Sequence, residues 1–92
     1  MKFTLTHARA VIGNDIKVSV EADDGKEIRR VLTILDGFQI ADDQLVQTSD
    51  SYERTFLGVG NAGPNVDHTL VVSAEQDDSK THSSTSIWTD SI

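Results

Sequence analysis

The longest apolar run in the chain covers residues 31–40, and an Asp36-Gly37 pair interrupts it. The stretch that enters this run fits two secondary structures. Four apolar residues have the i, i+3, i+4, i+7 spacing of one helix face: Ile28, Val31, Leu32 and Leu35. The same stretch also alternates at Ile28, Arg30, Leu32 and Ile34 and is rich in β-branched residues, which favours a strand. Asp36-Gly37 between apolar runs also indicates a hairpin, because a type I′ turn needs positive φ at both central residues.

The rest of the chain favours the strand. Apolar and polar residues alternate or β-formers dominate in short stretches separated by turn residues, and we expect strands over residues 2–12, 16–21, 28–35, 44–47, 52–57, 68–74 and 81–89. The segment 58–67 holds three glycines and the only proline, so it is expected to be a loop. A lone helix would conflict with this all-β pattern. The sequence therefore predicts one domain over residues 1–92, an antiparallel Greek-key β-sandwich of about seven strands, immunoglobulin-like in architecture.

Predicted core positions follow from the same alternation. Val18, Leu32, Phe56, Leu70 and Val72 are expected to be buried and in contact across the two sheets.

Composition narrows the classes of function. The chain has no cysteine, so disulfides, zinc thiolates and a cysteine nucleophile are excluded. Its N-terminus lacks the apolar segment of a signal peptide, and no apolar run reaches membrane-spanning length. We expect a cytoplasmic protein if the ends are natural, and an extracellular one if the chain is a domain of a longer protein.

The charge balance is strongly acidic, with 15 acidic and 8 basic residues and a net charge of −7. Such a chain repels nucleic acid and anionic lipid, and it favours cations or basic protein surfaces. The expected partner is therefore a protein with a basic surface, rather than nucleic acid or membrane. An alternative is that the charge only maintains solubility. The oligomeric state is left open.

One segment of the sequence echoes another. Residues 18–26 and 72–80 match at six of nine positions, and each is a predicted strand followed by an acidic turn. In a Greek-key sandwich these two turns lie at the same end. Six carboxylates are then expected to converge into a binding site, with Lys26 and Lys80 as partial compensation: Glu21, Asp23, Asp24, Glu75, Asp77 and Asp78.

Clustered carboxylates raise the alternative of a calcium site, because calcium takes six to eight oxygen ligands. Asp and Gly are also ordinary turn residues, and no dense D-x-D-x-D run is present. We expect no cofactor, with calcium as the alternative.

Histidine and tryptophan supply the other candidate sites. His7, His68 and His82 fall on three predicted strands without paired metal-ligand spacing. His68 shares the phase of the apolar residues that follow it, which predicts a half-buried structural histidine. Trp88 could stack on a sugar, but a lone Trp near a strand end more often covers the edge of a core.

Catalytic patterns are weak. Acidic turn residues offer neither the cleft nor the raised pKa that carboxylate catalysis needs. A Ser-His-Asp set from Ser83 or Ser84 with His82 has no nucleophile elbow to orient it. Residues 58–63 fit G-x-G-x-x-G, but Pro64 follows and no helix pattern does. We therefore expect a protein that is not an enzyme.

Several short motifs carry a resemblance to a known family. They are Leu35-Asp36-Gly37, an aromatic strand with Tyr52 and Phe56, and the run 68–74 (HTLVVSA) before an acidic turn. This succession resembles bacterial immunoglobulin-like, or fibronectin III-like, domains from about Asp15 to Thr89. In that family LDG closes a hairpin and an HTL-x-V-x-A strand leads into an Asp-rich turn.

The resemblance implies a β-sandwich module of secreted or surface proteins, including polysaccharide-degrading enzymes, where such domains act as spacers or binding accessories. We expect a non-enzymatic structural or protein-interaction module with an acidic loop end. One alternative is a carbohydrate-binding accessory domain, which needs Trp88, Tyr52 or Phe38 exposed and coplanar with a groove. A small hydrolase, which needs a cleft holding His82 and an acid, is the other.

Overall fold

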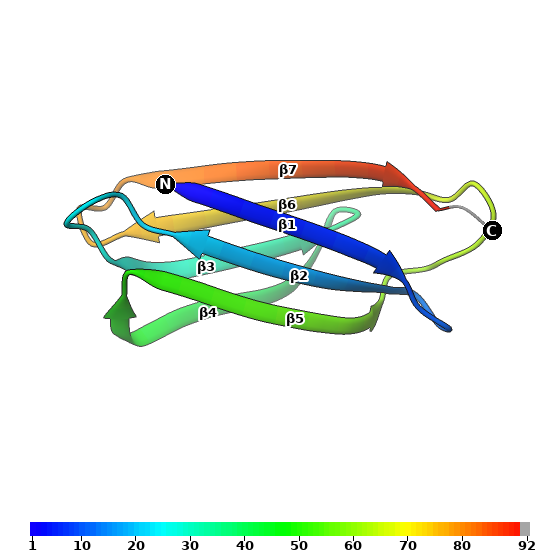
Figure 1. Cartoon of the computed structure of the whole chain (residues 1–92), viewed down its shortest axis with the longest axis horizontal. Helices are drawn as coiled ribbons and strands as arrows, with labels where there is room; N and C mark the ends of the chain where they lie inside the picture. Colours follow the sequence, from blue (N-terminus) through cyan, green and yellow to red (C-terminus); the bar gives the residue numbers. More distant parts are fainter. Residues whose placement is uncertain (91–92) are drawn as a thin grey trace.

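Seven strands make up the computed structural model, which describes residues 1–90 (Figure 1). The strands are β1 (Lys2–Arg9), β2 (Asn14–Glu21), β3 (Ile28–Leu35), β4 (Phe38–Ser49), β5 (Ser51–Val59), β6 (Asp67–Gln76) and β7 (Thr81–Thr89). Within this range no segment forms a helix long and apolar enough to cross a membrane.

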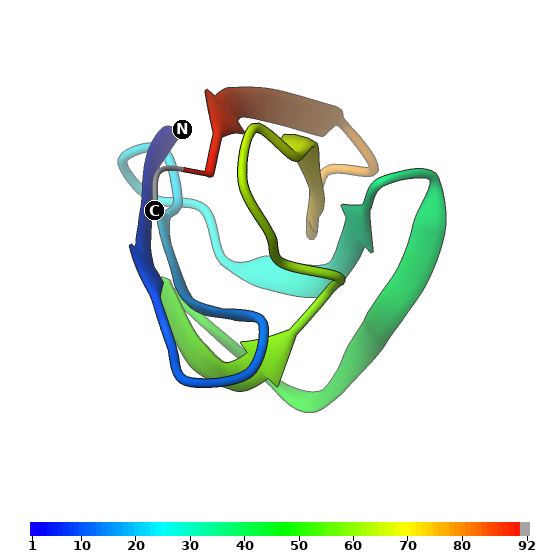
Figure 2. The same ribbon diagram turned by 90° about the vertical axis from the view of Figure 1, so that its right-hand side faces the viewer.

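The strands form two antiparallel sheets that face each other around the core (Figure 2). One sheet has the order β1-β2-β5, and the other has the order β4-β3-β6-β7. The predicted all-β sandwich is confirmed. The ambiguous stretch is strand β3, so the helical interpretation of its apolar spacing is wrong.

The core lies between the sheets and follows the period of two. β2 and β6 each present every second side chain to it, in the phase that the sequence predicted. The buried apolar residues are Ile16, Val18, Val20, Ile28, Val31, Leu35, Ala41, Phe56, Leu70, Val72 and Ala74, each at most 8% exposed.

β3 presents a different face to the core from the one expected. The pairing register shifts between Ile28 and Arg30 against both neighbouring strands, as in a β-bulge. The extra residue reverses the alternation, so that Val31 and Leu35 point inward. Leu32, predicted to lie in the core, is half-buried on the outer face of the sheet. That part of the core prediction is wrong.

β1 ends sooner than the sequence pattern indicated. It stops at Arg9, and the apolar residues Val11 and Ile12 are largely exposed in the turn before β2. Glycine is required in this turn because the backbone here lies against β5. A Cβ atom on Gly13 would fall 2.7 Å from the carbonyl carbon of Gly58. Only glycine fits this approach, and Gly13 also has positive φ.

β4 is longer than the short edge strand expected at residues 44–47. It covers Phe38–Ser49 and pairs with β3, with a second register shift near Ile34. The polar residues in the middle of β4 interrupt the apolar alternation, so the sequence pattern did not indicate its full length. Asp42 and Asp43 belong to the strand and form ion pairs with Arg30 and Arg54 on neighbouring strands.

The β3–β4 turn has the geometry that Asp-Gly predicted. Asp36 has φ 51° and Gly37 has φ 81°, the two positive values that a type I′ turn requires.

Candidate functional site

The two acidic turns lie side by side at one end of the sandwich, on the left in Figure 1. Buried Gln76, the last residue of β6, joins them. The backbone N–H of Asp23 donates to Gln76 Oε1 at 2.8 Å, and Gln76 Nε2 donates to Asp23 Oδ2 at 3.2 Å. The N–H of Asp77 also donates to the carbonyl oxygen of Glu27 at 2.9 Å. The predicted carboxylates are therefore positioned on neighbouring loops.

Three of the six carboxylates are engaged by local partners. Asp23 contacts the Met1 ammonium group, and this contact, followed by the bond from Gln76, holds the Asp23 pKa below its ordinary value. Glu75 pairs with Arg29 at 2.9 Å. Asp78 accepts a hydrogen bond from the Lys80 N–H at 3.0 Å.

The other three carboxylates are exposed: Glu21, Asp24 and Asp77. Among the described residues their side chains make no ion pair or hydrogen bond. They are the carboxylates of this end that remain available to a partner.

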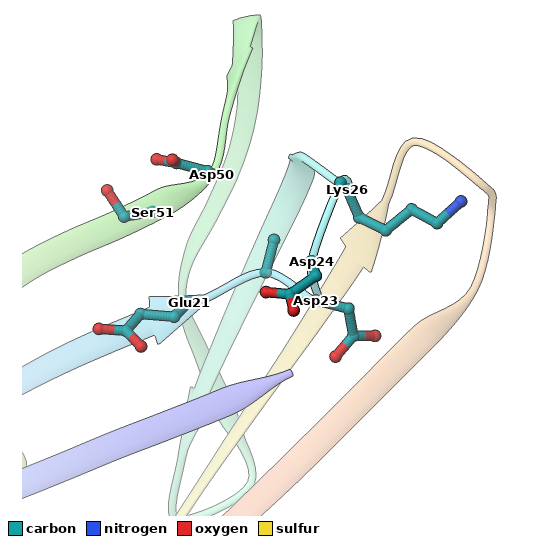
Figure 3. Close-up of a pocket in the computed structure, with 8 residues that line it drawn as sticks. Glu21, Asp23, Asp24, Lys26, Asp50 and Ser51 are labelled. Atoms are coloured by element: carbon teal, nitrogen blue, oxygen red, sulfur yellow. The ribbon is translucent and has the colours of Figure 1, made fainter.

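An open hollow of about 310 Å³ lies beside the β2–β3 loop. Its polar lining comes from Glu21, Asp23, Asp24, Lys26, Asp50 and Ser51. Figure 3 shows Asp24 on the side of the loop that faces the hollow, whereas Lys26 extends away from Asp50.

Asp50 is a member of this acidic end that the sequence did not indicate. It sits at the β4–β5 corner, where its carbonyl oxygen accepts a hydrogen bond from the Ala22 N–H at 2.9 Å. The pairing of β5 with β2 places it there, with Ser51 opposite Glu21. Asp50 follows the polar stretch whose strand was not recognised, so its position could not be derived.

The carboxylates of the acidic end are spread apart. Within residues 1–90, no group of three or more His, Asp or Glu side chains is arranged to hold a metal ion. The carboxylates spread along three connections instead of converging on one point.

The opposite end of the molecule holds a buried histidine. His68, the first inward residue of β6, is 1% exposed, so it is more deeply buried than predicted. Its Nδ1 lies 2.7 Å from Asp36 Oδ2, and its Nε2 lies 2.8 Å from Asp90 Oδ2. Sequence reasoning missed both partners, because Asp36 was assigned to the turn and Asp90 follows the last strand.

The ionisation of this cluster follows from its contacts. Burial disfavours the charged ring, but hydrogen bonds to Asp90 and Asp36 outweigh it and raise the pKa of His68. Burial likewise opposes the charge on Asp90, yet its hydrogen bonds with His68 and the Gly63 N–H lower the pKa of Asp90. Both shifts favour the charged forms, an imidazolium on His68 and a carboxylate on Asp90.

Trp88 is enclosed rather than offered to a ligand. The His7 ring stacks on it with centroids 4.2 Å apart, and the His68 ring lies 5.2 Å away at a tilt of 31°. Tyr52 lies near the acidic end, half-buried, and its hydroxyl donates to Asp43. Phe38 is exposed at the other end of the molecule. These aromatic rings therefore do not form one coplanar platform.

The residues considered for catalysis lie on both faces of β7. His82 Nε2 lies 3.9 Å from Asp23 Oδ2. Ser83 points to the opposite face of the strand, and Ser84 shares the face of His82. The G-x-G-x-x-G match at residues 58–63 leads into β6, not into a helix.

The seven strands in two antiparallel sheets define an immunoglobulin-like or fibronectin III-like β-sandwich. Among solved structures, the chain is similar to one described as fibronectin(III)-like modules of Clostridium thermocellum CbhA. The two are 21% identical, with a TM-score of 0.55, over 98% of this chain and 97% of that one. This likeness concerns the fold and confirms the predicted sandwich. No protein-family model matches the sequence, and no curated protein matches it.

Proposed function

We propose that the protein is a non-enzymatic structural or protein-interaction module whose acidic end binds a basic surface of a partner protein. One observation carries the proposal: the six predicted carboxylates and Asp50 lie on strand ends and adjoining connections at a single end, where Glu21, Asp24 and Asp77 are exposed and unpaired among the described residues.

Electrostatics supports this mode of binding. A net charge of −7 speeds encounter with a positive surface, and a one-sided cluster orients that encounter. Each exposed charge pair contributes only about 0.2–1 kcal/mol, and salt screens it. Each contact of the predicted interaction is therefore weak, so that binding depends on several contacts together. It also depends strongly on salt concentration.

Two other functions are less well supported. A carbohydrate-binding accessory domain would have to rely on Phe38 alone, because Trp88 is covered by histidine rings and Tyr52 bonds to Asp43. A hydrolase would need a serine in hydrogen-bond contact with His82, and among the described residues no such hydrogen bond is found for Ser83 or Ser84.

The test measures binding of an oligolysine peptide by calorimetry at low and at high salt. We expect the Asp24→Asn, Asp77→Asn double variant to weaken binding by about threefold to tenfold at low salt. The matched control is Asp15→Asn with Asp67→Asn, which removes the same charge away from the acidic end. Equal weakening by both pairs would mean that only net charge matters, and the proposed site would be wrong.

A second measurement separates a basic partner from calcium. Thermal unfolding is followed in calcium, in magnesium and in sodium chloride of matched ionic strength. The proposal predicts equal small shifts, because all three screen the acidic end. A rise specific to calcium would assign the acidic end to a metal instead, since a ligand that binds only the native state stabilises it by mass action.

A further inference from the structure

Three separate segments meet at His68. The ring belongs to the start of β6, Asp36 to the β3–β4 turn, and Asp90 to the segment that follows β7 (right side of Figure 1). Both ring nitrogens lie within 2.8 Å of a carboxylate oxygen. These two contacts bridge segments 32 and 22 residues from His68.

Only the charged ring satisfies this geometry. An imidazolium has two N–H donors, whereas a neutral imidazole has one donor and one acceptor. A carboxylate oxygen is purely an acceptor. When His68 loses its proton, one of its nitrogens therefore turns a lone pair toward a carboxylate oxygen, and that contact becomes repulsive.

The surroundings of the two carboxylates decide which contact opens. The Asp90 side chain is 1% exposed and also accepts from the Gly63 N–H at 3.4 Å, so it cannot be solvated in place. The Asp36 side chain is 33% exposed and reaches water. An unpaired buried charge costs far more than a solvated one. The neutral ring is thus expected to keep its N–H on Asp90 and to lose Asp36.

We propose that His68, Asp36 and Asp90 form a pH-sensitive cluster: the protonated ring holds the Asp36 side chain against β6, and deprotonation releases that side chain while the Asp90 contact persists, as does the backbone hydrogen bond from the Asp36 N–H to the Thr69 carbonyl oxygen at 2.8 Å. This device is independent of the acidic end and goes beyond the proposed function. Release affects more than one contact, because Asp36 Oδ1 also accepts from the Thr69 N–H at 2.8 Å.

Asp36 also lines a hollow of about 340 Å³. Its other lining residues are Leu35, Phe38, Ile40, Gly60 and Asn61. Release of the Asp36 side chain therefore takes place beside the exposed ring of Phe38.

The other groups around His68 do not reverse the upward shift of its pKa. From β2, Asn14 Nδ2 lies 3.4 Å from His68 Nε2. From β7, the Trp88 ring lies 5.2 Å from the His68 ring, and His7 of β1 stacks on the same indole. Beside the ring, a Cβ atom on Gly60 would lie 3.8 Å from Cε1. Within residues 1–90, the charges that act on His68 are those of Asp36 and Asp90, and both favour protonation.

Trp88 is the only tryptophan and reports the charge of its neighbour, because imidazolium quenches indole fluorescence more strongly than imidazole does. The titration uses a His7→Gln background, since His7 also stacks on the indole. We expect emission to rise with pH, with a midpoint above the ordinary histidine value of 6.5. Adding Asp36→Asn should move the midpoint to lower pH. The matched control Asp67→Asn, which removes an exposed carboxylate beside His68 in sequence, should leave it nearly in place.

Amide hydrogen exchange of the wild-type protein tests the release itself. Relative to intrinsic exchange rates, protection of the Thr69 amide should fall through the same midpoint, whereas protection of Val72 in the middle of β6 should not. Unchanged Thr69 protection across the titration would overturn the proposal. So would a fluorescence midpoint at or below 6.5, or one that Asp36→Asn does not move.

Discussion

At the scale of single residues, ion pairs of β4 connect strands both between the two sheets and within one sheet. Asp43 on β4 pairs with Arg54 on β5 at 2.8 Å and accepts from the Tyr52 hydroxyl, so it joins the edges of the two sheets. On the adjacent position, Asp42 forms a bidentate pair with Arg30 at 2.8 and 2.7 Å within its own sheet. Neighbouring carboxylates on one strand thus act on different interfaces.

This arrangement predicts the ionisation of the only tyrosine. Burial, followed by the hydrogen bond to Asp43, raises the pKa of Tyr52 above its ordinary value of 10. Asp43→Asn should lower that pKa, because the negative charge that opposes tyrosinate is gone. Ultraviolet absorbance of tyrosinate across an alkaline titration measures it. Asp42→Asn is the control, and an equal shift in both variants would show that the contact with Asp43 is not the cause.

At the scale of elements, the β-bulge in β3 decides which side chains stabilise the sandwich. It places Leu32 on the outer face and leaves Leu70, on the neighbouring strand β6, in the core. Identical substitutions at these two positions therefore probe opposite faces of the same sheet.

Leu70→Ala and Phe56→Ala should each lower the free energy of unfolding by roughly 2–5 kcal/mol, because each leaves a cavity in the core. Leu32→Ala should cost about 1 kcal/mol, since its side chain is half-solvated before the substitution. Chemical denaturation with a constant m-value measures all three. A loss for Leu32→Ala as large as that for Leu70→Ala would contradict the assigned phase of β3.

The bulge also explains what could and could not be predicted from the sequence. β2 and β6 keep an unbroken period of two. Alternation therefore predicted their buried faces correctly, from Ile16 to Val20 in β2 and from His68 to Ala74 in β6. In β3 the extra residue puts Ile28 and Val31 on the same face, three positions apart, which imitates a helical repeat. A bulge adds no distinctive residue type, so alternation alone could not reveal it.

The two ends of the molecule also differ in how far they could be predicted from the sequence. The acidic turns could be placed together because their position follows from the Greek-key order and from the repeated sequence. The cluster around His68 could not, because Asp36 and Asp90 reach it from distant parts of the chain. Only the burial of His68 had a signal, in its shared phase with Leu70.

At the scale of the whole molecule, the sandwich is elongated, with extents of 43 × 20 × 18 Å, and its ends differ in chemistry. One end carries exposed carboxylates and the N-terminus. The other carries the buried His68 cluster and the exposed apolar residues Val11 and Ile12. Titration acts on both ends and should therefore shape the stability of the entire domain.

Stability is expected to be highest in mildly acidic solution. The lowered pKa values of Asp42, Asp43 and Asp90 contribute stability above the ordinary aspartate value of 3.8, and it is lost as pH falls through their folded values. The raised pKa of His68 contributes stability below 6.5, and it is lost as pH rises through its folded value. Denaturation midpoints across pH should therefore peak between these limits. A stability that keeps rising above neutral pH would contradict this balance.

The most direct test of the acidic end as an interaction surface is a nuclear magnetic resonance titration of the labelled protein with oligolysine. If the acidic end is the interaction surface, amide shifts will move in the β2–β3 loop, at Asp50 and in the β6–β7 turn, and high salt will abolish these changes. Shifts spread evenly over the molecule, or confined to the end around His68, would contradict it.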